Sequence, residues 1–215
     1  MVQVMYYDNK STDDSIKSNV IADFFIKKVN KNLEKEESIT HLKLQKILYY
    51  SYVWYLVLKK KRIFEDPIEA WPYGPVIRSQ YDRLKKYGSN NITLDAIESS
   101  ADIASDDLVV FLDTIWDAYG QYSTGRLVEK THEEAPWQEV CCNKDKIITD
   151  NAIEDFYALE NISALLPENT IIRQGDDGYE MLVLKKEIVD AINTPDSDCE
   201  KFDIEELYRE IEDDI

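Results

Sequence analysis

The residues that could do chemistry in this chain are few and far apart. The sequence has two histidines, His41 and His132, which fall in different predicted helices. Zinc hydrolases place two histidines at helical spacing, and the run His132-Glu133-Glu134 lacks the second one. The adjacent Cys141 and Cys142 have no spacer that would let both thiolates bind one tetrahedral metal. We therefore expect no metal site.

Motifs of nucleophilic and phosphate chemistry are also missing from the sequence. It contains no Gly-x-Ser-x-Gly, no P-loop and no Gly-x-Gly-x-x-Gly motif, and six glycines leave little room for a phosphate-binding loop. A pair of carboxylates could be chosen almost anywhere among 43 acidic residues, so such a pair indicates nothing. We expect a protein that is not an enzyme and that has neither catalytic residues nor a cofactor.

The distinctive residues are instead aromatic or polar groups within apolar segments. Large aromatic side chains at helical spacing belong most often to a core, and this interpretation is favoured for Tyr50, Trp54 and Trp71. Gln45 lies in the middle of an apolar helix face, so its amide needs partners, for which the backbone of residues 71–76 is a candidate. His132 is expected to stack or hydrogen-bond at the junction with Pro136-Trp137, in a structural role.

Helical periodicity predicts the elements that would position these residues. Apolar residues recur at three- and four-residue steps over about 14–33, 40–58 and 105–119, which predicts three helices. The helix at 40–58 is apolar on most sides and is expected to be central. The expected N-caps are Asp13 or Asp14 for the first helix, Ser38 or Thr40 for the second and Ser105 for the third, which should end at Gly120.

The remaining helices are predicted from turn and cap residues. Gly74-Pro75 is expected to begin a helix that Gly88 closes, because proline is favoured at the first helical position. Residues 64–70 should form an extended link before it, and residues 88–105 a loop with a short strand or turn at 91–97. Further helices are expected from Ser123 towards Glu134 and from Ala135-Pro136-Trp137 onward.

The C-terminal third differs in charge and in pattern. Residues 143–215 hold 21 Asp and Glu against 7 Lys and Arg, a net charge of −14 out of −18 for the whole chain. This balance argues against direct nucleic-acid binding and permits a basic protein partner. We expect a short helix at 150–160, a β-hairpin with strands at 170–173 and 179–184, a helix at 185–192 and an amphipathic terminal helix.

These features predict a mainly α protein with an acidic α+β extension. The expected organisation is a flexible N-terminus at 1–14, a compact helical domain at 15–142 and the extension at 143–215. An odd number of cysteines and the lack of a secretory segment favour a reduced, cytoplasmic location. The most apolar stretch, residues 47–58, is too short to cross a bilayer, so no membrane association is expected.

Several short motifs, taken together in their order and spacing, resemble the Panacea antitoxin domain, a SocA-like helical family of bacterial and phage proteins. They are the run from Leu42 to Tyr50, the approach Ile68-Glu69-Ala70-Trp71 with Tyr73-Gly74-Pro75-Val76, Tyr87-Gly88, and the closing Tyr119-Gly120, Thr131-His132 and Pro136-Trp137. The resemblance covers residues 15–142. The signature residues that it implies, mainly structural, are Gln45, Tyr50, Trp54, Trp71, Tyr73, Gly74, Pro75, His132, Pro136 and Trp137.

The resemblance implies an antitoxin that neutralises a co-encoded protein toxin by direct binding, or an adaptor that delivers the toxin to a protease. It also implies an origin in a prophage or another mobile element. On physical grounds the acidic terminal helix is a candidate clamp for a basic partner, through Phe202, Glu205, Glu206, Leu207, Tyr208 and Asp213. Two alternatives remain open: a solvated extension that binds nothing, and an inhibitor whose acidic surface mimics nucleic acid to block a basic target protein.

Overall fold

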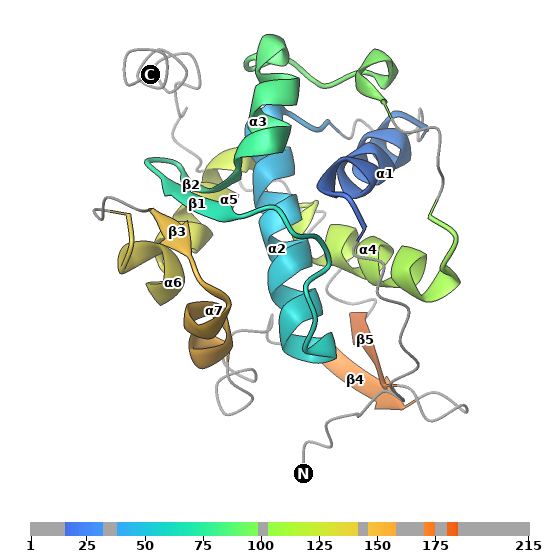
Figure 1. Cartoon of the computed structure of the whole chain (residues 1–215). Coiled ribbons are helices and arrows are strands. Elements are labelled where there is room, and N and C mark those ends of the chain that lie inside the picture. Colours follow the sequence, from blue (N-terminus) through green and yellow to red (C-terminus); the bar gives the residue numbers. More distant parts are fainter. Residues whose placement is uncertain are drawn as a thin grey trace, which may run out of the picture.

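The fold is known from a computed structural model that describes residues 16–31, 38–98, 103–141, 146–157, 170–174 and 180–184. The described chain is mostly helical and carries a small antiparallel sheet of three strands, as Figure 1 shows. The mainly α class predicted from the sequence is therefore confirmed. The sheet, in contrast, was not foreseen.

Helix α2 (His41–Lys59) runs through the middle of the molecule, and the other helices and the sheet surround it (Figure 1). Most of its side chains are buried, as expected for a helix that is apolar on most sides. The side chain of Thr40 accepts a hydrogen bond from the backbone N–H of Lys43, which identifies Thr40 as the N-cap. The helix ends at Lys60, which adopts a left-handed conformation.

Helices α1 (Ser18–Lys31) and α4 (Asp106–Tyr119) pack on α2 through amphipathic faces. Phe25 of α1 and Trp116 of α4 meet with ring centroids 6.1 Å apart. Ser105 caps α4 by accepting from the backbone of Leu108, and Gly120 follows the last helical residue, both as predicted. The expected caps of α1, Asp13 and Asp14, lie outside the described residues.

The strands β1 (Ile68–Trp71) and β2 (Gly74–Ile77) form an antiparallel hairpin in which Ile68 pairs with Ile77 and Trp71 with Gly74. The expectation that Gly74-Pro75 begins a helix is therefore wrong. Gly74 has a φ of +91° and closes the turn, and the helix α3 (Arg78–Leu84) begins only after the strand. The expected extended link at 64–70 becomes a strand in its last part.

Between α3 and α4 the chain forms short helical turns. The 3₁₀ turn Lys85–Tyr87 ends at Gly88, the residue expected to close this helical region. The second 3₁₀ turn, Leu94–Ala96, lies in the stretch for which a short strand or turn was predicted. Asn91 makes an isolated β-bridge with Thr40, next to the start of α2.

Helices α5 (Thr124–His132) and α6 (Ala135–Gln138) follow α4, and Ser123 caps α5 as predicted. Strand β3 (Ile147–Ile148) then pairs with β1, so the strand order is β2-β1-β3. Helix α7 (Asp150–Phe156) comes next, capped by Thr149. Ile148, Ile153 and Tyr157 are buried in the same core as α2, although the sequence grouped them with the acidic extension.

The predicted hairpin of the extension is confirmed, because β4 (Thr170–Gln174) and β5 (Glu180–Leu184) pair as antiparallel strands. The helices expected at 185–192 and at the C-terminus lie outside the described residues. So do the proposed partner-binding residues Phe202, Glu205, Glu206, Leu207, Tyr208 and Asp213. Within the described part of the chain, no helix combines the length and the hydropathy needed to cross a membrane.

Candidate functional site

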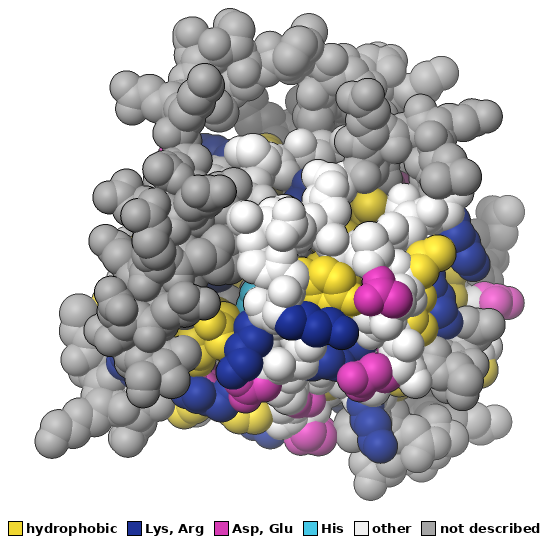
Figure 2. Space-filling model, turned by 90° about the horizontal axis from the view of Figure 1, so that it is seen from above, with side chains coloured by type: hydrophobic (Ala, Val, Ile, Leu, Met, Phe, Trp, Pro, Cys, Tyr) yellow, Lys and Arg dark blue, Asp and Glu magenta, His cyan; other side chains and the backbone are white. Residues whose placement is uncertain are grey.

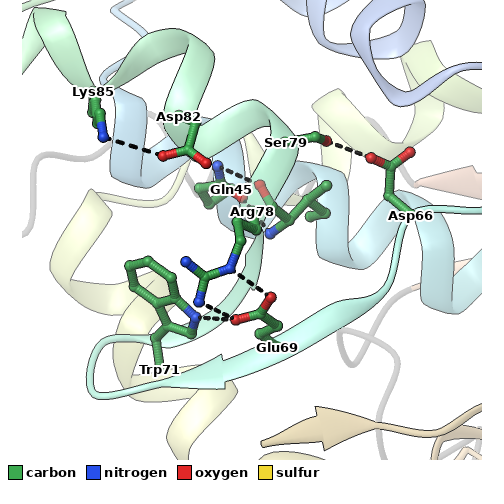
Figure 3. A network of polar contacts seen from close by, with 9 residues as sticks. Gln45, Asp66, Glu69, Trp71, Arg78, Ser79, Asp82 and Lys85 are labelled. Carbon is green, nitrogen blue, oxygen red and sulfur yellow. Dashed lines mark hydrogen bonds and ion pairs between the residues drawn. The ribbon is translucent and has the colours of Figure 1, made fainter. Parts of the chain in front are cut away.

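Most signature residues of the sequence gather where the β1–β2 hairpin meets α2, α5 and α6, whereas Trp54 contacts Tyr119 and Tyr157. Gln45 of α2 binds the end of β2 much as a neighbouring strand would. Its Oε1 accepts from the N–H of Ile77 at 2.8 Å, and its Nε2 donates to the carbonyl of Ile77 at 3.4 Å. The buried amide therefore finds backbone partners, one residue beyond the segment 71–76 expected from the sequence. Figure 3 shows Gln45 close to Arg78, at the start of α3.

A buried lysine holds the turn of the same hairpin. Lys46 is fully buried, and its Nζ donates to the carbonyl of Pro75 at 2.9 Å. Burial lowers the pKa of Lys46 well below its usual value, and the nearby Glu134 opposes this shift. A Cβ at Gly74 would lie 2.5 Å from Oγ1 of Thr131 and 2.8 Å from Nζ of Lys46. The close packing of the turn on α2 and α5 thus requires glycine at position 74.

The outer face of the hairpin carries a polar cluster around Trp71, which is half-buried (Figure 3). Glu69 accepts from Trp71 Nε1 at 2.8 Å and from Nε and Nη2 of Arg78 at 2.8 and 2.9 Å. These hydrogen bonds from Arg78 lower the pKa of Glu69. The Arg78 guanidinium also lies 5.0 Å from the Trp71 ring centroid, a cation–π contact. Trp71 therefore lies at the edge of the core, with one side towards solvent.

The junction between α5 and α6 is fixed to this hairpin. The rings of His132 and Trp137 stack with centroids 3.9 Å apart, the contact expected from the sequence, and Trp137 Nε1 donates to the carbonyl of Trp71 at 2.9 Å. Pro136 is buried in the first turn of α6. Burial and the nearby Lys46 lower the pKa of His132, so the neutral imidazole is favoured. These contacts fix the α5–α6 junction to the hairpin.

Behind this junction, a buried carboxylate gathers tyrosines from distant parts of the chain. Glu134 accepts hydrogen bonds from Tyr49 at 2.7 Å and from Tyr50 at 2.9 Å. Burial raises the pKa of Glu134 to about 7, although hydrogen bonds from Tyr49, Tyr157 and Tyr50 lower it. Glu134 was not among the site residues predicted from the sequence. Its position between two family motifs, Thr131-His132 and Pro136-Trp137, was the signal in the sequence that could have pointed to it.

The stacked rings of Tyr50 and Tyr119, with centroids 3.9 Å apart, extend this cluster. Trp54 Nε1 donates to the Tyr119 hydroxyl at 2.7 Å, so a second signature residue is satisfied within the core. A cavity of about 240 Å³ lies beside the cluster. The hollow beside Trp71 and Tyr73 is much smaller, about 20 Å³, little more than one water needs.

Figure 2 shows Lys and Arg side chains alternating with Asp and Glu around a small apolar area on the face seen from above. On α3, Arg78 and Asp82 are both well exposed.

Within the ranges that the structure describes, no group of three or more His, Cys, Asp and Glu side chains could hold a metal ion.

The geometry defines a mainly helical fold in which signature residues hold the β1–β2 hairpin on α2 and on the α5–α6 junction. Residues 44–138 match the family model described as "Antitoxin SocA-like, Panacea domain". The resemblance drawn from the sequence is thereby confirmed over α2 to α6, and this match suggests an antitoxin-type role with a protein partner. Searches among curated proteins and among solved structures find no significant match.

Proposed function

We propose that this protein is an antitoxin that neutralises a co-encoded protein toxin by direct, non-catalytic binding. The observation that carries the proposal is the match of residues 44–138 to the antitoxin SocA-like Panacea domain. The braces described above lie within or directly beside this segment. They support a rigid scaffold, on which a partner-specific surface can vary without loss of the fold.

Within this proposal, the outer face of the β1–β2 hairpin is a candidate for partner contact. Trp71 and Tyr73 are half-buried there, and Arg78 is exposed beside them. Tryptophan, tyrosine and arginine are the residue types most often found at energetic hot spots of protein interfaces. The Glu69 carboxylate holds Arg78 and Trp71 in a fixed geometry, which lowers the entropy lost on binding.

The acidic extension is the second candidate for partner contact. Its net charge of −14 would speed association with a basic toxin and make the complex sensitive to salt. The same observation favours a second function, an inhibitor that mimics nucleic acid to block a basic target. These two functions differ in the partner: the first requires a toxin encoded beside this chain, and the second requires a nucleic-acid-binding protein.

Co-expression with the product of the adjacent gene tests the proposal. We expect a stable complex on co-purification, with the toxin level unchanged if the antitoxin blocks its target sterically. A toxin that is instead degraded faster in the presence of this chain would indicate delivery to a protease. Absence of a complex and of any change in toxin level, with both proteins folded, would contradict an antitoxin role.

A further inference from the structure

The cavity beside Glu134 has a wall built mainly from aromatic rings. Tyr50, Tyr119, Phe156 and Tyr157 line it, and it is partly open to solvent. Tyr50 and Tyr119 are stacked, and Phe156 meets Tyr157 edge to face with centroids 4.9 Å apart. Its volume, about 240 Å³, corresponds to several water molecules and is sufficient for an unbranched chain of four or five heavy atoms.

The charged side chains that line this cavity differ in their exposure to solvent. Glu134 is buried, whereas Glu133 has a side chain that is 68% exposed. Lys130 also lines the cavity, but its Nζ lies 5.3 Å from the ring centroid of Tyr122, which is not part of the lining. The cavity thus has one carboxylate inside it and a second one towards solvent.

The hydrogen bonds that Glu134 already makes decide which kind of group the cavity can bind. Its carboxylate accepts from Tyr49 and Tyr50, and Tyr157 is a third donor. A carboxylate offers about four lone-pair sites, so the capacity for one more donor remains. Tyr49 and Tyr50 use their hydroxyl hydrogens on Glu134 and have none left to donate. When Glu134 is ionised, its open position therefore favours an incoming donor, and its charge would repel an anion.

We propose that this cavity binds an organic ammonium or guanidinium group, held by the Glu134 carboxylate and enclosed by the aromatic rings. Aromatic side chains attract cations through their ring faces, and a carboxylate forms a charge-assisted hydrogen bond with the same group. A Lys or Arg side chain of a bound partner, or a free alkylamine, presents this chemistry. Binding of a partner's Lys or Arg side chain rests on the proposed function, whereas binding of a free alkylamine does not.

Titration of the full-length chain with n-butylammonium above pH 7, where Glu134 is ionised, tests the proposal when it is followed by NMR. We expect saturable shifts in the amide signals of Tyr119, Glu134 and Tyr157, and none with 1-butanol or butyrate at the same concentrations. The two controls have the same four-carbon chain but lack the positive charge. Equal shifts with 1-butanol, or no saturable shift with n-butylammonium, would overturn the proposal.

Substitutions in the cavity lining test whether Glu134 is the group that binds n-butylammonium. Glu134→Gln preserves the shape and should weaken n-butylammonium binding about tenfold. Glu129→Gln makes the same charge change on α5 outside the cavity and should leave the affinity unchanged. If Glu134→Gln does not fold, Lys130→Gln provides the test, because loss of the competing cation should strengthen binding about threefold. Weaker binding by Lys130→Gln would count against the proposal.

A competition arm identifies the source of the cation. If a partner inserts a basic side chain, n-butylammonium should displace the partner from the wild-type chain at concentrations that saturate the NMR shifts. A complex that is insensitive to n-butylammonium would assign the cavity to a free amine. The amine titration stands in either case, so failure of the proposed antitoxin function and failure of the cation site give different results.

Discussion

Gly74 combines a positive φ with too little room for a side chain. Its φ of +91° is strained for any L-residue with a Cβ, and that Cβ would collide with Thr131 and Lys46. We predict that Gly74→Ala lowers the free energy of unfolding by about 2–4 kcal/mol, the sum of backbone strain and displaced packing. Urea denaturation monitored by circular dichroism measures this loss.

Gly88 is the matched control for this prediction. It also has a positive φ, +52°, but no atom lies within 4 Å of a Cβ built there. Gly88→Ala should therefore cost only the backbone strain of a positive φ with a ψ of −130°, about 1–3 kcal/mol. Equal losses for the two variants would show that the contact with Thr131 and Lys46 does not constrain the hairpin turn.

The raised pKa of Glu134 predicts a pH dependence of stability. The folded state holds the proton up to about pH 7, whereas an unfolded glutamate loses it near 4.5, so stability is fully present below 4.5 and falls as the pH rises towards 7. As the pH rises through this window, the free energy of unfolding of the wild type should fall by up to about 3 kcal/mol relative to that of Glu134→Gln. Urea unfolding of both proteins at several pH values gives the difference.

The groups that face Glu134 come from several elements: Lys46, Tyr49 and Tyr50 from α2, Tyr119 from α4, Lys130 from α5, and Tyr157 after α7. Buried His41, whose pKa is lowered to about 4, changes stability in the opposite direction over part of this range. It is present in both proteins and cancels in the difference. A pH-independent difference between wild type and Glu134→Gln would contradict the raised pKa.

At the scale of elements, β3 and α7 are predicted to belong to the folding unit. Ile148, Ile153 and Tyr157 are buried, and Asp150 accepts from Tyr52 and Arg62 of the core region. A chain that ends at Tyr157 should unfold cooperatively with nearly wild-type stability. One that ends at Cys142 should lose about 4 kcal/mol or more, because each large apolar side chain contributes about 1.5–3 kcal/mol on burial. Thermal denaturation of the two truncated chains compares them, and equal stabilities would contradict this assignment.

The elements that the sequence predicts well are those whose signals are local. Thr40, Ser105 and Ser123 cap helices as expected, because a cap is set by a few neighbouring residues. The β1–β2 hairpin escaped prediction because its strands have four residues each and are fixed by Gln45 and Lys46, about thirty residues away. Gly74-Pro75 therefore fits a helix start locally and a strand only in the folded context.

The site was predictable only in part, for a similar reason. Stacking of His132 at the Pro136-Trp137 junction follows from residues that are close in sequence. The burial of Glu134 depends instead on Tyr49 and Tyr50, which are 85 and 84 residues away. No local pattern distinguishes a buried glutamate from the exposed ones around it when its partners come from another helix.

At the scale of the whole molecule, the proposed function separates the scaffold from the recognition surface. The signature residues bind the hairpin, the helices and the core to one another, so their loss should reduce stability and partner binding together. Partner specificity is then expected in exposed groups such as Arg78 and in the acidic extension. Arg78→Ala should weaken a complex with little change in stability, because the Arg78 side chain is 56% exposed and its ion pair with Glu69 is screened by solvent.

Growth of bacteria that express the neighbouring gene's product, with and without this chain, tests the antitoxin role. We expect the neighbouring product alone to arrest growth and co-expression of the wild-type chain to restore it. A matched culture with the folded Arg78→Ala variant should show weaker rescue. Continued growth arrest in the presence of well-expressed, folded wild-type protein would contradict the antitoxin role.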